Sequence, residues 1–165
     1  MKRIMKRGVA ISVYNHMAKL PFGHLPDGII EAVMDNFINL GKEAEQFQRL
    51  TQELNRRLFE GVDKKRIDEY NSAIKTASVD EIKELYPDIY ALVLKQKNIV
   101  DSLRSKDVEV ELEAVDRKEF IKGIIKGKPD VAMGTLDMLA SLFTNESKEA
   151  DFGELDSLIS KVDAI

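Results

Sequence analysis

The sequence contains no cysteine and no tryptophan, and only four of its 165 residues are proline. The lack of cysteine excludes disulfides, a thiolate nucleophile and a sulfur-ligated metal. No apolar run approaches the ~18 residues that a membrane-spanning helix needs, so we expect no contact with a membrane. The basic start of the chain is followed by too short an apolar segment for a secretory signal. These absences favour a cytoplasmic protein.

Charged residues are abundant at 33%, and the net charge is −4. The two ends of the chain differ in sign. Residues 144–165 are mainly acidic, and we expect them to form an acidic C-terminal tail or a short helix outside a single helical domain at 1–143. The start of the chain is basic through Lys2, Arg3, Lys6 and Arg7. These four residues are either simply solvated or contact an anion.

An apolar row follows residues 27–60 in alternating steps of three and four. Such steps return side chains to one helical face, and a narrow stripe over about four heptads is a coiled-coil seam that another helix must cover. We predict one long helix, with Asp27 as N-cap and Gly61 as the stop. The residues expected to pair with another helix are Ile30, Val33, Phe37, Leu40, Phe47, Leu54 and Leu58.

Shorter helices are predicted around the long one. A helix is expected at 9–20, although the β-branched run at 9–14 also permits a strand. Asp63 can cap a helix to 77, Ser78 and Glu81 form a capping box, and Pro87 requires a break. The remaining helices are expected at 88–104, after Asp116, and from a cap at Asp130 to about 143.

The segment 108–115 alternates apolar and acidic residues with a period of two, which predicts a strand. Its backbone groups need partners, and we expect Val108, Val110 and Leu112 to take part in strand pairing. The segment 9–14, a second copy across a dimer axis and another protein are all possible partners. The fold class is therefore mainly α: an elongated helical hairpin or bundle with one short β-strand segment.

No pattern in the sequence indicates a catalytic, cofactor or metal site. The two histidines, His16 and His24, lack metal-site spacing, and a zinc site would need carboxylates to complete it. The alternating glutamates of 108–113 fit a solvent-facing side of a strand. The basic segment 122–128 lacks the order of a phosphate-binding loop. We predict no cofactor, no metal and no enzymatic activity, and we expect no direct contact with nucleic acid.

Several segments together resemble a family of small helical proteins. They are Ala18-Lys-Leu-Pro21, the long helix with Glu45 and Phe47, the alternating run 108–113, and Leu136-Asp-Met-Leu139. This order is similar to that of uncharacterised proteins from tailed-phage and prophage gene clusters, over roughly residues 9–143. The resemblance implies a viral or prophage origin, in the host cytoplasm or the virion, and no known activity.

These observations lead to one expected function and two alternatives. We expect a non-enzymatic protein that acts by protein–protein interaction, as a homo-oligomer or with another virion or host protein. The first alternative is a binder of a small ligand or host factor that counters bacterial defence, with residues 2–7 at an oligomer interface. The second is an accessory protein associated with nucleic acid.

Overall fold

The computed structural model describes residues 1–144, which form seven helices and one two-stranded antiparallel sheet. The predicted mainly α fold with a short β segment is confirmed. The described residues gather into two compact units, one from 1–46 together with residues from 104 onward, and one from 47–103. Each unit has its own apolar core. The expected acidic tail lies outside the described residues, apart from Thr144.

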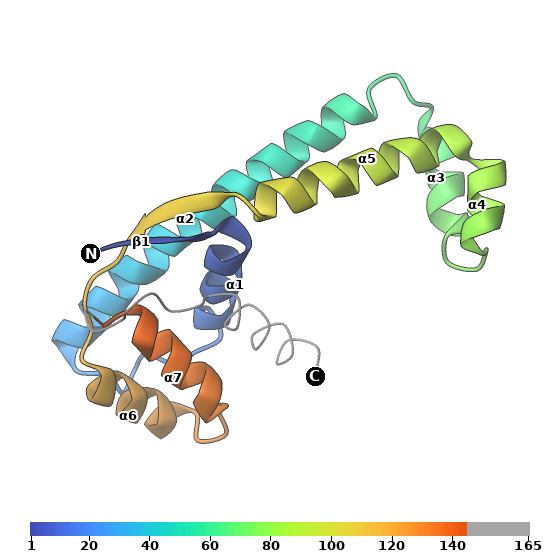
Figure 1. Cartoon of the computed structure of the whole chain (residues 1–165). Coiled ribbons are helices and arrows are strands. Elements are labelled where there is room, and N and C mark those ends of the chain that lie inside the picture. Colours follow the sequence, from blue (N-terminus) through green and yellow to red (C-terminus); the bar gives the residue numbers. More distant parts are fainter. Residues whose placement is uncertain (145–165) are drawn as a thin grey trace. The chain divides into compact units, whose positions relative to one another are not determined.

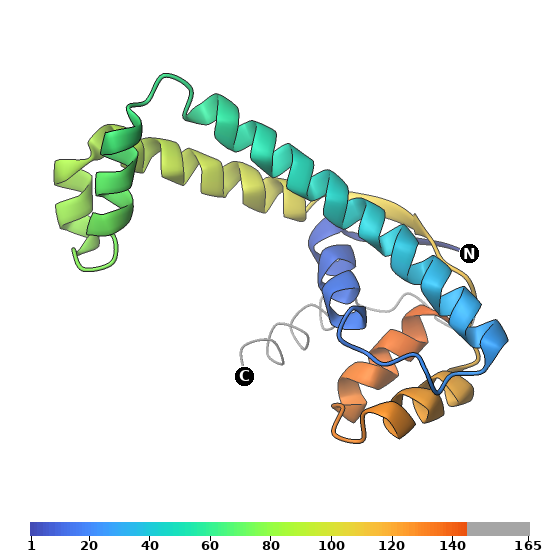
Figure 2. The ribbon, with the colours of Figure 1, turned by 180° about the vertical axis from the view of Figure 1, so that it is seen from behind.

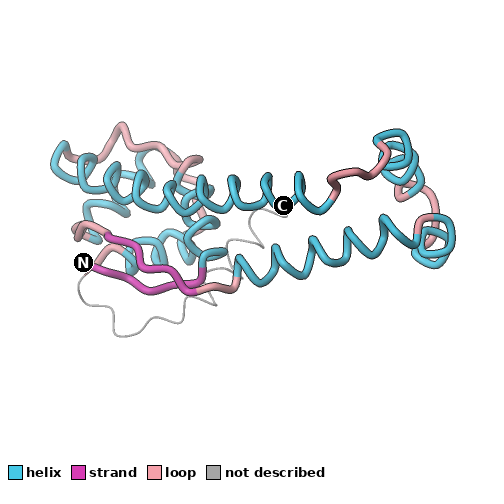
Figure 3. Tube along the Cα trace, turned by 90° about the horizontal axis from the view of Figure 1, so that it is seen from above, coloured by secondary structure: helices cyan, strands magenta, loops and turns pink. Residues whose placement is uncertain are grey.

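The first unit, which we call unit 1, contains the sheet and four helical segments (Figure 1). Its elements are β1 (Lys2–Lys6), α1 (Arg7–Met17), the first part of α2 (Asp27–Leu58), β2 (Asp107–Glu111), α6 (Arg117–Gly127) and α7 (Met133–Leu142). The strands pair from Lys2 opposite Glu111 to Lys6 opposite Asp107. Figure 3 shows the two strands side by side.

The predicted first helix is confirmed, although it begins at Arg7 and ends at Met17 and is therefore shifted from the expected 9–20. The alternative, a strand at 9–14, is wrong. The partner of β2 is β1, which was not among the partners considered. The reason lies in the sequence of β1, KRIMK. Its inward positions hold Arg3 and Met5, and its outward, exposed positions hold two lysines and the apolar Ile4. The sequence therefore shows no alternation of apolar and polar residues that would predict a strand.

The long helix α2 runs unbroken from Asp27 to Leu58, close to its predicted end. Gly61 follows with a φ of 82°, a conformation that suits a glycine at the end of a helix. The predicted row on α2 differs in burial along its length. Val33 and Leu40 are fully buried in unit 1, whereas Phe47, Leu54 and Leu58, which belong to unit 2, are half-buried.

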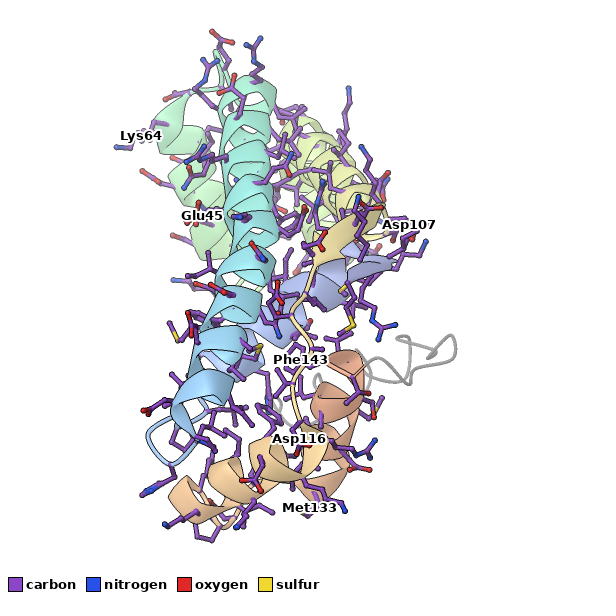
Figure 4. The ribbon with its side chains drawn as sticks, turned by 90° about the vertical axis from the view of Figure 1, so that its left-hand side faces the viewer. Glu45, Lys64, Asp107, Asp116, Met133 and Phe143 are labelled. Carbon is purple, nitrogen blue, oxygen red and sulfur yellow. The ribbon has the colours of Figure 1, made fainter. Side chains whose placement is uncertain are left out.

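The core of unit 1 is formed mainly by α1, α6 and α7. Phe120 and Phe143 meet edge to face, with ring centroids 5.8 Å apart. The Asp116 carboxylate accepts a hydrogen bond from the Glu119 N–H at 2.9 Å, so the predicted cap of α6 is confirmed. Figure 4 labels Asp116 and Phe143 at the ends of α6 and α7. The predicted cap at Asp130 is wrong, because α7 starts later, after Ala132.

Unit 2 contains the last part of α2 together with α3 (Lys64–Ala73), α4 (Val79–Leu85) and most of α5 (Pro87–Arg104). The predicted starts of these helices are confirmed. The Asp63 carboxylate accepts from the Lys65 N–H, and Ser78 and Glu81 form a complete capping box. Pro87 is the first residue of α5, a position that needs no N–H donor. Figures 1 and 2 show α2 and α5 running alongside each other within this unit.

Candidate functional site

The candidate site lies in unit 2, where the end of α2 from Phe47 to Leu58 packs beside α5. We call these two segments the helix pair. A hydrogen bond between the side chains of Gln96 and Asn55 joins them. Both segments carry apolar residues, and all of these are half-buried apart from Ile89, which is buried: Phe47, Leu54, Leu58, Ile89, Leu92, Val93, Ile99, Val100 and Leu103.

The apolar residues of the helix pair are only partly covered within the described part of the chain. The buried apolar residues described in unit 2 are Tyr70, Ile82 and Ile89, and only Ile89 belongs to the helix pair. Leu50, next to the seam on α2, is 38% exposed. Two helices alone cannot surround a seam residue, because each residue needs neighbours on both flanks to leave water. The predicted interface at Phe47, Leu54 and Leu58 therefore still has an open side.

A pocket of about 240 Å³ opens where α2, α3 and α5 meet. Its lining residues are uncharged: Asn55, Phe59, Ile67, Tyr70, Asn71, Ile89, Val93 and Gln96. The volume exceeds the ~150 Å³ of an engineered apolar cavity that holds benzene. A lining without charge provides no counter-ion for a phosphate, a carboxylate or an ammonium group. The pocket fits an uncharged group of one or two rings.

Polar atoms at the pocket are confined to amides and a phenol. The hydrogen bond from the Gln96 Nε2 to the Asn55 Oδ1 leaves the Asn55 Nδ2 group as a donor and the Gln96 Oε1 as an acceptor for a further partner. Burial raises the pKa of the Tyr70 phenol, which keeps it neutral. These groups can bind and orient an uncharged partner.

Exposed ion pairs surround the helix pair. Arg66 at the start of α3 binds Asp88 at the start of α5 at 2.7 Å, and this pairing lowers the pKa of Asp88. On α2, hydrogen bonds from Arg56 and Arg57 lower the pKa of Glu53 to about 2. The outward face of α2 is therefore charged, in contrast to its apolar seam.

The four residues predicted to contact an anion lie at the start of unit 1, each beside a partner from its own chain. Lys2 binds Glu109 and Lys6 binds Asp107, both at 2.7 Å on an exposed face. Arg3 donates to the Thr144 carbonyl oxygen. Arg7 is buried, with its side chain 5% exposed, and binds Glu43 at 3.1 Å. The structure does not gather the four into one cluster, and contact with an anion remains a prediction.

The strand-pairing residues lie where the alternation predicts. Val108, Val110 and Leu112 are buried, and the glutamates between them are exposed. The alternation ends after Leu112, because Ala114 is exposed and Val115 is buried. Sequence reasoning missed Asn36 of α2, whose amide hydrogen-bonds to the backbone of Glu113. An asparagine on a helix carries no signal that would reveal such a distant partner.

Neither related proteins nor clusters of metal-binding side chains point to a function. No protein-family model, curated protein or solved structure matches the chain. Within residues 1–144, no group of three or more histidine, aspartate or glutamate side chains could hold a metal ion. In the same part of the chain, no helix is both long and apolar enough to cross a membrane.

Proposed function

We propose that this protein is a non-enzymatic binding protein whose helix pair associates with helices of a partner, and that the partner is a second copy of the chain. The observation that supports this is the half-buried seam of unit 2. Burial of apolar surface stabilises a protein by ~25 cal/mol per Å², and the apolar side chains of this seam are only partly buried. A partner helix completes that burial.

A second copy is a suitable partner because the same open seam exists on each copy. Two helix pairs packed face to face form a four-helix arrangement, in which every seam residue has neighbours on both flanks. The charged outward face of α2, with Glu53 between Arg56 and Arg57, remains in water in that arrangement. A two-fold axis then relates identical surfaces.

The pocket beside the seam adds an anchor point. Interfaces gain much of their affinity from a few aromatic or other large side chains that fill a pocket. The uncharged lining around Tyr70 and Val93 suits an apolar or aromatic side chain of the partner. The same pocket also favours the second candidate function, a small-ligand binder, whose ligand would be an uncharged molecule.

We further propose that the protein belongs to a phage or prophage assembly and acts in the host cytoplasm or the virion. The support for this is the resemblance carried by residues 9–143. Another virion or host protein would then use the same open seam in place of a second copy.

The experiment is sedimentation velocity with light scattering over 1–200 µM protein. Leu50→Glu places a charge beside Phe47 and Leu54 at a site that is already 38% exposed. The matched control is Leu85→Glu on α4, where the side chain is 61% exposed. We expect the wild type and the control to self-associate alike, and Leu50→Glu to need at least tenfold more protein. A wild type that is monomeric throughout this range, or equal association of all three, would contradict the proposal.

A further inference from the structure

Ile4, at the centre of β1, has the most exposed large apolar side chain described in residues 1–144, at 65%. Lys2 and Lys6 flank it on the same face of the strand, because side chains two residues apart point the same way. This face therefore presents one apolar group between two cations. Nothing in the protein–protein function proposed for unit 2 uses it.

Within residues 1–144, the backbone of β1 is paired on one side only. The Leu112 N–H donates to the Met1 carbonyl at 2.8 Å, and the Arg7 N–H donates to the Lys106 carbonyl at 2.9 Å. Because hydrogen-bonded positions alternate in an antiparallel ladder, Arg3 and Met5 also face β2. The N–H and C=O groups of Lys2 and Ile4 then point away from β2. The backbone hydrogen bonds found within residues 1–144 include none that pairs these two residues with another strand.

The opposite edge of the sheet is covered at one end. Asn39 of α2 donates to the Glu111 carbonyl at 3.1 Å, and Asn36 bonds to both backbone groups of Glu113, just beyond β2. Side chains of α2 thus occupy the outer edge of β2 at this end. An open edge strand is a template for another strand, and lysines on such an edge discourage indiscriminate pairing. The two edges of this sheet differ in this way, and β1 is the available one.

We propose that the open edge of β1 binds an extended segment of a different protein, in which two acidic residues four positions apart have an apolar residue midway between them. Residues directly opposite each other across a strand pair interact, and opposite charges there stabilise the pair. The segment would place acids opposite Lys2 and Lys6 and an apolar side chain opposite Ile4. On the paired side of β1, acids of β2 already bind both lysines: Glu109 binds Lys2 diagonally, and Asp107 binds Lys6 from the directly opposite position.

A second copy fits this edge poorly. Two β1 strands paired antiparallel around Ile4 would place Lys2 of each copy opposite Lys6 of the other. Like charges directly opposite each other destabilise a strand pair. Registers that avoid this pairing shorten the overlap of a strand that is only five residues long. In strand addition, main-chain hydrogen bonds provide affinity and side chains select the partner. Because the side chains here are two lysines, they select an acidic strand.

The test uses the full chain and a blocked heptapeptide, Ac-TETVTET-amide, which carries two glutamates and a central valine on one face, and binding is followed by backbone amide NMR and hydrogen exchange. In the free protein, we expect the Arg3 and Met5 amides to exchange slowly and the Ile4 amide to exchange fast. Saturating peptide should slow exchange at Ile4 at least tenfold and leave Arg3 and Met5 unchanged. The charge-reversed peptide, Ac-TKTVTKT-amide, should bind at least tenfold more weakly.

Two variants test the edge itself. Ile4→Pro removes the outward N–H and keeps the groups that face β2, so peptide binding should fall at least tenfold, whereas Ile4→Val should bind as the wild type does. If Ile4→Pro loses slow exchange at Arg3 and Met5, the double variant Lys2→Gln/Lys6→Gln replaces it. That variant should lose the preference for the acidic peptide over the basic one.

Three results would overturn the proposal. The first is the absence of any change at Ile4 with millimolar acidic peptide. The second is equal binding of both peptides to the wild type. The third is slow exchange at Ile4 that depends on protein concentration alone, which would identify a second copy as the occupant. Leu50→Glu should leave peptide binding unchanged, so failure at this edge is distinguishable from failure of the helix pair.

Discussion

Asn36 and Glu113 are joined by two hydrogen bonds, although 76 residues separate them in the chain. The Asn36 Nδ2 donates to the Glu113 carbonyl at 3.0 Å, and the Glu113 N–H donates to the Asn36 Oδ1 at 2.6 Å. Asn36 is fully buried. Its side chain therefore pairs with β2 as the backbone of a neighbouring strand would, and it fixes α2 against the end of this strand.

Replacing Asn36 with leucine should destabilise the protein by about 1–3 kcal/mol. The change keeps the volume but leaves the N–H and C=O of Glu113 without their partner. The free energy of unfolding measured in urea checks this. Asn39→Leu is the matched control, because it removes a single bond to the Glu111 carbonyl at a more exposed site, and it should cost less than about 1 kcal/mol. Equal losses of stability from the two changes would show that the pair of hydrogen bonds at Asn36 contributes no more than the single one at Asn39.

The sequence predicts the features of this fold that depend on neighbouring residues. Capping by Asp63, Ser78 and Asp116 and the helix start at Pro87 agree with the structure, because each involves groups at most a few residues apart. The length of α2 was also predictable, since its apolar row is continuous.

Features that depend on distant partners were not predictable. β1 lacks an apolar alternation, so its pairing with β2 became visible only in the structure. Asn36 looks like a polar interruption of an apolar helix face until the backbone of Glu113 is placed beside it. The partial burial of Phe47 and Leu54 was only partly predictable. The apolar pattern indicates that at least one helix packs against these residues, but it contains no information on the number of helices.

Gly41 permits the close approach of α1 to α2. A Cβ atom at Gly41 would lie 2.9 Å from the Cε2 atom of Tyr14, and the Tyr14 ring is stacked on Phe37 with centroids 4.7 Å apart. The ring therefore has little freedom to move. Gly41→Ala should destabilise the protein by about 1–2 kcal/mol, because overpacking outweighs the ~1 kcal/mol that alanine gains in a helix.

Gly28 is the matched control for Gly41, because it lies in the same helix and a Cβ there would meet no atom within 4 Å. Gly28→Ala should leave the stability unchanged or raise it by up to about 1 kcal/mol. Thermal and urea unfolding of the two variants measure the difference. Destabilisation of similar size at both positions would refute the close-approach argument.

The ion pair of Arg7 and Glu43 should be coupled more strongly than the exposed pairs of this protein. Arg7 is 5% exposed and Glu43 18%, whereas Lys2 and Glu109 are both more than half exposed. Removing one partner of a buried pair leaves an uncompensated charge, so Arg7→Met should cost up to about 3 kcal/mol. The double variant Arg7→Met/Glu43→Leu should recover much of that loss.

A double-mutant cycle measures this coupling, with urea unfolding of the two single variants and the double variant. The control cycle uses Lys2 and Glu109, where exposure predicts a coupling below about 1 kcal/mol. A coupling for Arg7 and Glu43 no larger than that of the control pair would show that burial does not strengthen this interaction.

The ion pair of Arg66 and Asp88 should make the stability of unit 2 depend on pH in the acid range. The hydrogen bond from Arg66 lowers the pKa of Asp88 below its value in the unfolded chain, about 3.9. A carboxyl group with a lowered pKa stabilises the folded state fully above its unfolded value, and this stabilisation is lost as the pH falls through the folded value. Asp88→Asn should therefore unfold at a lower temperature than the wild type at pH 7, and the two melting curves should converge as the pH falls through the lowered pKa of Asp88. Glu84→Gln removes a charge from exposed α4 as a control, and its difference from the wild type should be smaller. A difference for Asp88→Asn that stays constant from pH 7 to pH 2 would be incompatible with a stabilising role for the ionised carboxylate.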